Sequence, residues 1–183
     1  GGGGGGGGKG GNKPVATVIG AASCEFLVGE IVSAEKHPEK DKLLTEQIDC
    51  GEGKPRTLVS GLVGHYEPAD IVGRKVIVLA NLKPKPFGSL ASHGMVVCAS
   101  NADHSKVELL VVPDGAKVGE RCVFPGFEGD AAGAGPMTKK KIFEKTQPDL
   151  ASGEDLVVTY KGAPMMTSAG PVKAASLVGA TIG

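Results

Sequence analysis

Two stretches of alternating apolar and polar residues, on either side of a short basic loop, constrain the fold of this chain most strongly. The first stretch is residues 26–32 (FLVGEIV) and the second is residues 44–50 (LTEQIDC). A period of two residues is typical of a β-strand, and the Pro and Gly residues around these stretches mark strand ends. The sequence therefore predicts a strand, a basic loop and a second strand across residues 26–50.

Similar short stretches continue along the first two thirds of the chain. We expect strands at residues 26–34, 44–50, 57–60, 75–80, 95–99 and 107–112. A short helix is expected at residues 67–72, between the third strand and the fourth. Five or six short strands with one intervening helix suit a mainly β fold in which a Greek-key sheet closes into a barrel.

The composition divides the chain into three parts. Residues 1–23 begin with eight glycines and are expected to form a flexible tether, because glycine at this density cannot recover its conformational entropy by packing. Residues 24–125 carry the barrel, and residues 126–183 are expected to form a linker and a smaller C-terminal α+β subdomain. About 55 residues with few aromatics bury little surface alone, so this subdomain should pack on the barrel.

The C-terminal part has its own helix and strand signals. Thr138 is a candidate N-cap for a helix at residues 139–146, and Pro148 should end that helix. A strand at residues 156–160 and a partner within residues 163–168 should follow. The expected helix begins with three lysines, whose charges would oppose the macrodipole and favour a nearby anion.

The remaining composition argues against catalysis, metal binding and membrane insertion. The four cysteines are dispersed without a metal-type spacing, and they fit reduced thiols in the cytoplasm. Sequence motifs for a nucleophile elbow, a phosphate loop or a zinc protease are absent, so we expect no enzyme activity and no cofactor. No apolar run approaches the roughly 20 residues needed to cross a bilayer.

Three sets of basic residues are candidates for binding phosphate groups. They are Lys36, Lys40 and Lys42 with the neighbouring His37; Arg56, Lys83 and Lys85; and Lys139, Lys140 and Lys141. Nucleic-acid binding needs cations along a groove and flat side chains on which bases stack. The chain has 20 basic and 20 acidic residues, so such binding would have to come from local charge on one face. The alternative for each set is a solvated loop or helix turn.

A series of short motifs in a fixed order resembles a known family. The motifs are residues 37–43 (HPEKDKL), 48–51 (IDCG), 56–62 (RTLVSGL), 81–84 (NLKP), 92–100 (SHGMVVCAS), 139–144 (KKKIFE) and 147–150 (QPDL). Together they resemble the tRNA-binding domain of endothelial monocyte-activating polypeptide II. The same domain occurs in yeast-type synthetase cofactors and as an appendage of tyrosyl- and methionyl-tRNA synthetases. The resemblance covers roughly residues 24 to 175.

This resemblance implies an OB-fold barrel that binds tRNA without reading its base sequence. It implies that aminoacyl-tRNA synthetases are partners, and that Ser92, Gly94 and Met95 lie near the RNA-facing surface. The C-terminal part would mimic a partner surface that shorter relatives form by dimerising, so we expect a monomer. Family members often carry an Arg soon after the Pro of the NLKP motif. This chain has Lys85-Pro86-Phe87-Gly88-Ser89 there, so stacking by Phe87 could replace charge.

Two other functions remain as alternatives. A neutral barrel that lacks this Arg could serve as a protein-interaction scaffold for synthetases, with weak or no RNA binding. A cytokine-like signal is known in one branch of the family, where the corresponding first strand is basic. Here Leu27 and Glu30 stand where arginines would be, which does not favour that function.

Overall fold

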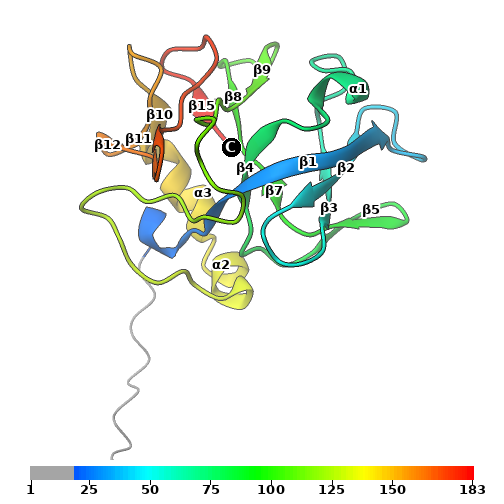
Figure 1. Cartoon of the computed structure of the whole chain (residues 1–183). Helices are drawn as coiled ribbons and strands as arrows, with labels where there is room; N and C mark the ends of the chain where they lie inside the picture. Colours follow the sequence, from blue (N-terminus) through cyan, green and yellow to red (C-terminus); the bar gives the residue numbers. More distant parts are fainter. Residues whose placement is uncertain (1–18) are drawn as a thin grey trace, which may run out of the picture.

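A five-stranded antiparallel sheet forms the centre of the molecule, for which the computed structural model describes residues 19–183 (Figure 1). The strand order is β3-β2-β1-β4-β7. The strands are β1 (Phe26–Lys36), β2 (Leu44–Asp49), β3 (Arg56–Ser60), β4 (Lys75–Leu79) and β7 (Met95–Val96). The outer strands β3 and β7 contact each other, so the sheet curls into a nearly closed barrel. The predicted OB-type barrel is confirmed, and helix α1 (Pro68–Ile71) lies between β3 and β4 as expected.

Strand β1 shows why the barrel has two hydrophobic cores. Leu27 and Ile31 point into the barrel, where they join one buried cluster. Phe26 and Val28 point outward, and they join a second buried cluster that includes Phe124 and residues of the C-terminal part. Alternating side chains face opposite sides of a strand, so β1 is buried on both faces.

The C-terminal part packs on the outer face of β1 and β4. Its elements are α2 (Ala134–Lys139), α3 (Ile142–Thr146), β10 (Leu150–Ser152), β11 (Val158–Tyr160), β12 (Ala163–Pro164), β13 (Met166–Thr167), β14 (Gly170–Pro171) and β15 (Thr181–Ile182). The Phe124 ring meets Phe26 edge-on at 6.0 Å and Tyr160 at 5.8 Å between ring centroids. Strand β15 pairs with β8 (Cys98–Ser100), which also pairs with β9 (Val107–Leu109). The C-terminal part and the barrel thus share one core and one sheet.

Most of the expected N-terminal tether cannot be compared with the structure, but its last residues can. Residues 1–18 lie outside the described residues, but residues 21–23 form a 3-10 helix that packs on the fold. Ala21 is buried, and the Arg121 guanidinium donates to the carbonyl oxygens of Ala22 and Cys24. Residues 21–23, which the sequence assigns to the tether, are therefore part of the fold, and Ala21 contributes its side chain to the core.

The expected helix at residues 139–146 is two shorter helices. Helix α2 begins at Ala134, so Thr138 lies inside it and is not an N-cap. Lys141 has a left-handed backbone (φ 50°) and separates α2 from α3. Lys139 therefore lies in the last turn of α2, where a positive charge is favourable. The prediction that the lysines lie at a helix start was therefore wrong for Lys139, whereas Lys141 is the N-cap residue of α3.

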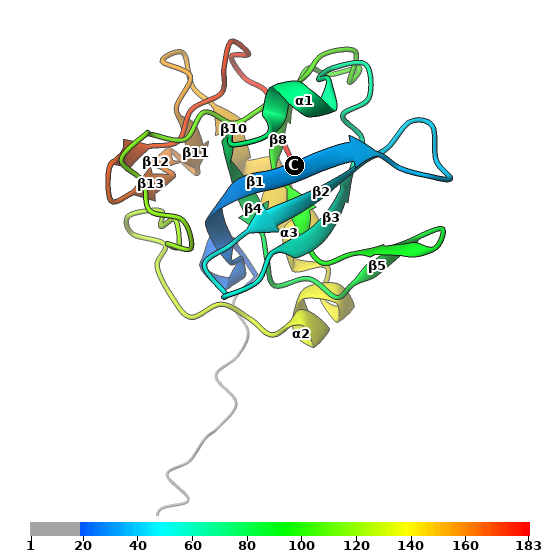
Figure 2. The same cartoon turned by 45° about the vertical axis from the view of Figure 1, so that its right-hand side comes forward.

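The structure contains a hairpin that the strand prediction missed. It consists of β5 (Lys85–Phe87) and β6 (Leu90–Ser92), which pair with each other and project from the barrel beside β3 (Figure 2). Two prolines, Pro84 and Pro86, argue against a strand inside a sheet but are compatible with an isolated edge hairpin.

All four cysteines are buried free thiols. Burial raises the pKa of Cys24 and Cys50 to about 11. It raises the pKa of Cys98 and Cys122 to about 12. Because the thiolate is the reactive form of cysteine, these side chains are unreactive at neutral pH.

Candidate nucleic-acid interface

The β1–β2 loop is locked onto the β5–β6 hairpin. His37 Nδ1 accepts the backbone N–H groups of Glu39 and Lys40 at 3.0 and 3.1 Å. The ring proton therefore lies on Nε2, which donates to the carbonyl oxygen of Phe87 at 2.8 Å. His37 is only 5% exposed, so it orders the loop and does not face a phosphate as the sequence suggested.

A second contact joins the same two segments at the hairpin tip. The Glu39 carboxylate accepts the Ser89 backbone N–H at 2.9 Å and also the Ser89 hydroxyl. These hydrogen bonds hold the pKa of Glu39 below its usual value. The loop that carries Lys36, Lys40 and Lys42 and the hairpin that carries Lys85 therefore form one continuous rim.

A groove of about 510 Å³ lies beside this rim, and we call it the hairpin groove. One wall comes from the barrel and the hairpin, and the other comes from α2 and α3, on the same lower side of the molecule in Figure 2. Its main lining residues are Lys83, Lys85, Phe87, Gly94, Met95, Thr138, Phe143 and Glu144. Lys83 and Lys85 of the second basic set line this groove, whereas the three lysines of the third set are not among its lining residues.

The lysines of the rim and the groove form no ion pairs among the described residues. Within residues 19–183, the one ion pair joins Arg56 to Glu52. The side chains of the first set, of Lys83 and of the three lysines at 139–141 are exposed, and of these Lys40 contributes to the lowered pKa of Glu39 without forming an ion pair. Lys85 Nζ lies 5.3 Å from the centroid of the Phe87 ring, a cation–π contact. Unpaired ammonium groups keep their full attraction for phosphate.

Arg56 differs from these lysines because the protein already uses its guanidinium. Its Nε and Nη2 donate to the Glu52 carboxylate at 2.6 and 2.8 Å. Its Nη1 donates to the carbonyl oxygens of Ala80 and His93 at 2.7 and 3.0 Å. In this arrangement Arg56 ties strand β3 to its neighbours, and the expected phosphate contact would require it to leave these partners.

Ser92 and Gly94 shape the loop behind the groove. The Ser92 hydroxyl accepts the Val59 N–H and donates its proton to the Gly94 carbonyl oxygen, both at 2.9 Å. Its proton is therefore not free for a contact with phosphate, although Ser92 lines the groove. Gly94 has a φ of 141°, and a Cβ there would lie 2.9 Å from the Leu79 carbonyl oxygen. Gly94 thus allows close packing of backbone on backbone.

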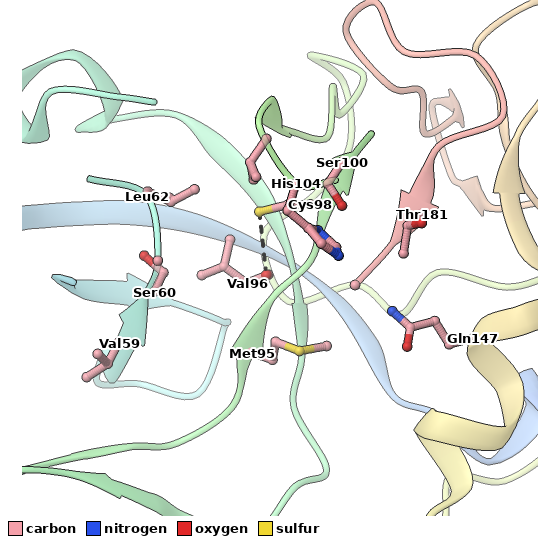
Figure 3. Close-up of a pocket in the computed structure, with 13 residues that line it drawn as sticks. Val59, Ser60, Leu62, Met95, Val96, Cys98, Ser100, His104, Gln147 and Thr181 are labelled. Atoms are coloured by element: carbon pink, nitrogen blue, oxygen red, sulfur yellow. Dashed lines mark hydrogen bonds between the residues drawn. The ribbon is translucent and has the colours of Figure 1, made fainter. Parts of the chain in front are cut away.

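Met95 lies between the hairpin groove and a second hollow of about 270 Å³, which Figure 3 shows. The second hollow is lined by neutral polar groups that include Ser60, Ser100, Gln147 and Thr181. It has no lysine or arginine in its lining, so it offers little attraction for phosphate. The hairpin groove is therefore the better nucleic-acid site.

A buried carboxyl group binds Ser60, one of the residues that line this second hollow, and sequence reasoning missed it. Glu46 on β2 is fully buried, and it accepts a hydrogen bond from the Ser60 hydroxyl. Its other oxygen has no partner within residues 19–183. Burial raises the pKa of Glu46 to about 7. The alternation of Leu44, Glu46 and Ile48 was the available signal, because it places all three on the same face of the strand.

Across residues 19–183, no three His, Cys, Asp or Glu side chains gather in a way that could hold a metal ion. No helix in this range combines the length and apolar character required to cross a membrane.

An OB-type barrel with unpaired lysines beside a partly apolar groove has the features of a nucleic-acid-binding domain. The family described as putative tRNA binding domain matches residues 26–121, more than half of the chain. The chain belongs to this family, as its motifs predicted. The C-terminal domain of Plasmodium vivax p43 superposes with a TM-score of 0.80 at 33% identity, covering 91% of this chain and 100% of that one.

Similar curated proteins are longer than this chain. A probable methionine–tRNA ligase of Oryza sativa is 45% identical over 171 residues, covering 93% of this chain and 21% of the ligase. The aminoacyl tRNA synthase complex-interacting multifunctional protein 1 of Mus musculus is 44% identical over 146 residues, covering 80% and 46%. The tRNA-aminoacylation cofactor arc1 of Schizosaccharomyces pombe is 44% identical over 138 residues, covering 75% and 31%. The chain therefore spans about a fifth to a half of these relatives.

Proposed function

We propose that this chain is a non-catalytic module that binds the tRNA backbone and assists an aminoacyl-tRNA synthetase. The observation that carries the proposal is the rim formed by the β1–β2 loop and the hairpin, whose lysines form no ion pair among the described residues and border the hairpin groove. Phosphate contacts of this kind attract any tRNA and do not read its base sequence.

The module acts by raising the local concentration of tRNA at its partner. A weak contact that is linked to an enzyme makes the second binding event intramolecular, so the combined affinity exceeds either contact alone. The names of the relatives, which are tRNA ligases, a cofactor of tRNA aminoacylation and a synthase complex protein, support this role. In the proposal the module is cytoplasmic and monomeric.

A salt titration of tRNA binding tests the proposal. We expect log K to fall steeply with log salt concentration, because each neutralised phosphate releases counterions. Charge reversal by Lys83→Glu or Lys85→Glu should weaken binding of all tRNA species alike and flatten the slope by about one unit each. A wild-type slope near zero, or no tRNA binding, would refute it.

Lys173→Glu is the matched control for these charge reversals. Lys173 is exposed, and its backbone bridges to Val157 next to β11, on the side of the molecule opposite the hairpin in Figure 1. The same change of charge should leave both the affinity and the slope close to those of the wild type. An equal loss in this variant would mean that only net charge matters.

Assembly with synthetases is a second candidate function, which the synthase complex relative favours. Synthetases that co-purify with this chain after nuclease treatment would support a direct protein contact. Their loss after nuclease treatment would mean that tRNA holds the partners together.

A further inference from the structure

The hairpin groove contains apolar and aromatic side chains, which a site for phosphate alone does not require. Its floor and walls include Phe87, Met95 and Phe143, together with Pro84 and Pro86. Binding to phosphate needs cations only, and apolar side chains add nothing to it. Flat and apolar surfaces beside lysines are instead suited to an unpaired base, whose ring stacks while its phosphate stays at the rim.

Glu144 is the second feature that phosphate binding leaves unexplained. Its carboxylate repels phosphate, yet it lies in the groove wall opposite the lysines of the hairpin. Its neighbour Phe143 is only 7% exposed and is anchored in the shared core, so the backbone of α3 that carries the exposed Glu144 side chain is fixed beside the groove. Within residues 19–183 its carboxylate makes no hydrogen bond or ion pair, and Thr138 lies in the same wall.

We propose that the hairpin groove binds one unpaired base of RNA and that Glu144 accepts a hydrogen bond from the exocyclic amine of that base. The inference rests on the proposed function and names the part of the RNA that this site takes. The groove volume of about 510 Å³ is within the roughly 300–1,000 Å³ range of pockets for small molecules, which suits a single nucleotide.

Base chemistry then sets a preference for cytosine over uracil. Cytosine presents the N4 amine, which donates a hydrogen bond to a carboxylate. Uracil has a carbonyl oxygen at the same position, and two acceptors facing each other repel. The two pyrimidines have nearly the same size and stack similarly, so Glu144 is the main source of discrimination. An unpaired base that all tRNAs share would satisfy this preference without distinguishing tRNA species.

Lysines of the groove hold the phosphates next to the inserted base. Lys83 and Lys85 line the groove on the hairpin side. The occupant must therefore carry negative charge as well as an apolar ring. Both requirements are met by a single-stranded nucleotide within an RNA chain.

The test is fluorescence anisotropy with short labelled oligocytidylate and oligouridylate of equal length, at one salt concentration. The full chain should bind oligocytidylate about fivefold more tightly or better, the low end of base discrimination by a side chain. In Glu144→Gln the ratio should fall to about one, because a Gln amide can accept from cytosine or donate to uracil. Intact tRNA should bind this variant at least as well as the wild type, since a negative charge is removed.

Glu154→Gln is the matched control, because Glu154 is exposed in the turn between β10 and β11 and makes the same change of charge. It should keep the cytosine preference.

Equal affinities in the wild type, or a preference that survives Glu144→Gln, would overturn the inference. If the chain bound tRNA but neither oligonucleotide, the inference would also be overturned, while the proposed function would remain. A cytosine preference without tRNA binding would instead overturn the proposed function. A basic peptide that alone binds the groove through Glu144 would assign it to a protein partner and also overturn the inference.

Discussion

The barrel wall formed by β1 and β4 and the wall formed by β3 and the hairpin differ in what covers their outer faces. Phe26 and Val28 of β1 and Leu79 of β4 are buried under the C-terminal part. On the other wall, Lys85 and Pro86 of β5 are exposed, and Phe87 is only half-buried. The outer face of the first wall is therefore buried in the core and stabilises the fold, whereas the outer face of the second wall stays accessible to a ligand.

This difference shows how a small domain with no excess charge can still bind an anion. The covered wall consists of apolar side chains. In the described part of the chain, Arg56 is the one basic residue that forms an ion pair, and the lysines near the open wall form none. Net charge therefore says less about binding than the placement of the charges that remain unpaired.

The largest expected effect tests the covered wall. Phe26 is fully buried between the barrel and the C-terminal part, so Phe26→Ala should lower the free energy of unfolding by about 3–5 kcal/mol. Urea unfolding followed by far-ultraviolet circular dichroism should show a single transition, because the barrel and the C-terminal part share this core.

Leu58→Ala is the comparison variant, since Leu58 is fully buried in the barrel cluster. It should also shift a single transition, by about 2–5 kcal/mol. If Phe26→Ala produced two transitions, with the barrel unfolding as in the wild type, the two parts would be separate units. The contrast between a covered and an open wall would then lose its structural basis.

The next effect concerns the buried carboxyl group inside the barrel. Burial raises the pKa of Glu46 from 4.5 to about 7, so the folded state holds this proton more tightly than the unfolded chain. The stabilising contribution is complete below about pH 4.5 and is lost as the pH rises through about 7. The total loss at alkaline pH is about 3 kcal/mol.

Glu46→Gln should remove this pH dependence, because an amide does not ionise. Urea unfolding at about pH 8.5 should show the variant more stable than the wild type, whereas at about pH 5 the difference should shrink or reverse. A wild-type free energy of unfolding that stays constant across this range would show that Glu46 is not protonated in the fold. The expected pH dependence would instead show that one buried group inside the barrel, and neither of the two walls, sets how stability changes with pH.

The smallest expected effect on stability concerns the hydrogen bonds of His37, which hold the β1–β2 loop against the β5–β6 hairpin. His37→Ala removes three hydrogen bonds that hold the loop, and it should cost about 1–2 kcal/mol. Affinity for tRNA should also fall, because Lys36, Lys40 and Lys42 are no longer held next to the hairpin. Thermal melting and a tRNA titration measure the two effects.

His65→Ala serves as the control, since His65 lies near α1 and outside the rim. It should leave tRNA affinity unchanged. If His37→Ala melted earlier but bound tRNA with wild-type affinity, the lock would matter for folding alone. The open wall would then not depend on the ordered loop.

Local patterns predicted the first barrel strands well because the alternation of apolar and polar residues lies within each strand. The predicted strands at 26–34 and 44–50 correspond to β1 and β2 within two residues. The predicted strand at 95–99 is instead divided into β7 and β8, because the chain changes partner from β4 to β9 and β15. Such a change depends on distant segments and leaves no trace in the local pattern.

The candidate site could be predicted only in part for the same reason. Residue type and motif order were enough to select Lys83, Lys85 and Met95, which line the hairpin groove. The second wall of the groove comes from α2 and α3, whose packing against the barrel no local pattern reveals. The internal hydrogen bonds that occupy Arg56 and Ser92 likewise depend on the folded backbone.

The inert state of the four native cysteines has a practical consequence. All of them are buried, with thiol pKa values of about 11 to about 12, so they should not react with alkylating reagents at neutral pH. A single cysteine introduced at an exposed lysine of the hairpin would then be the only thiol to take a fluorophore. The wild-type background is thus already suited to site-selective labelling, with no need to remove any native residue first.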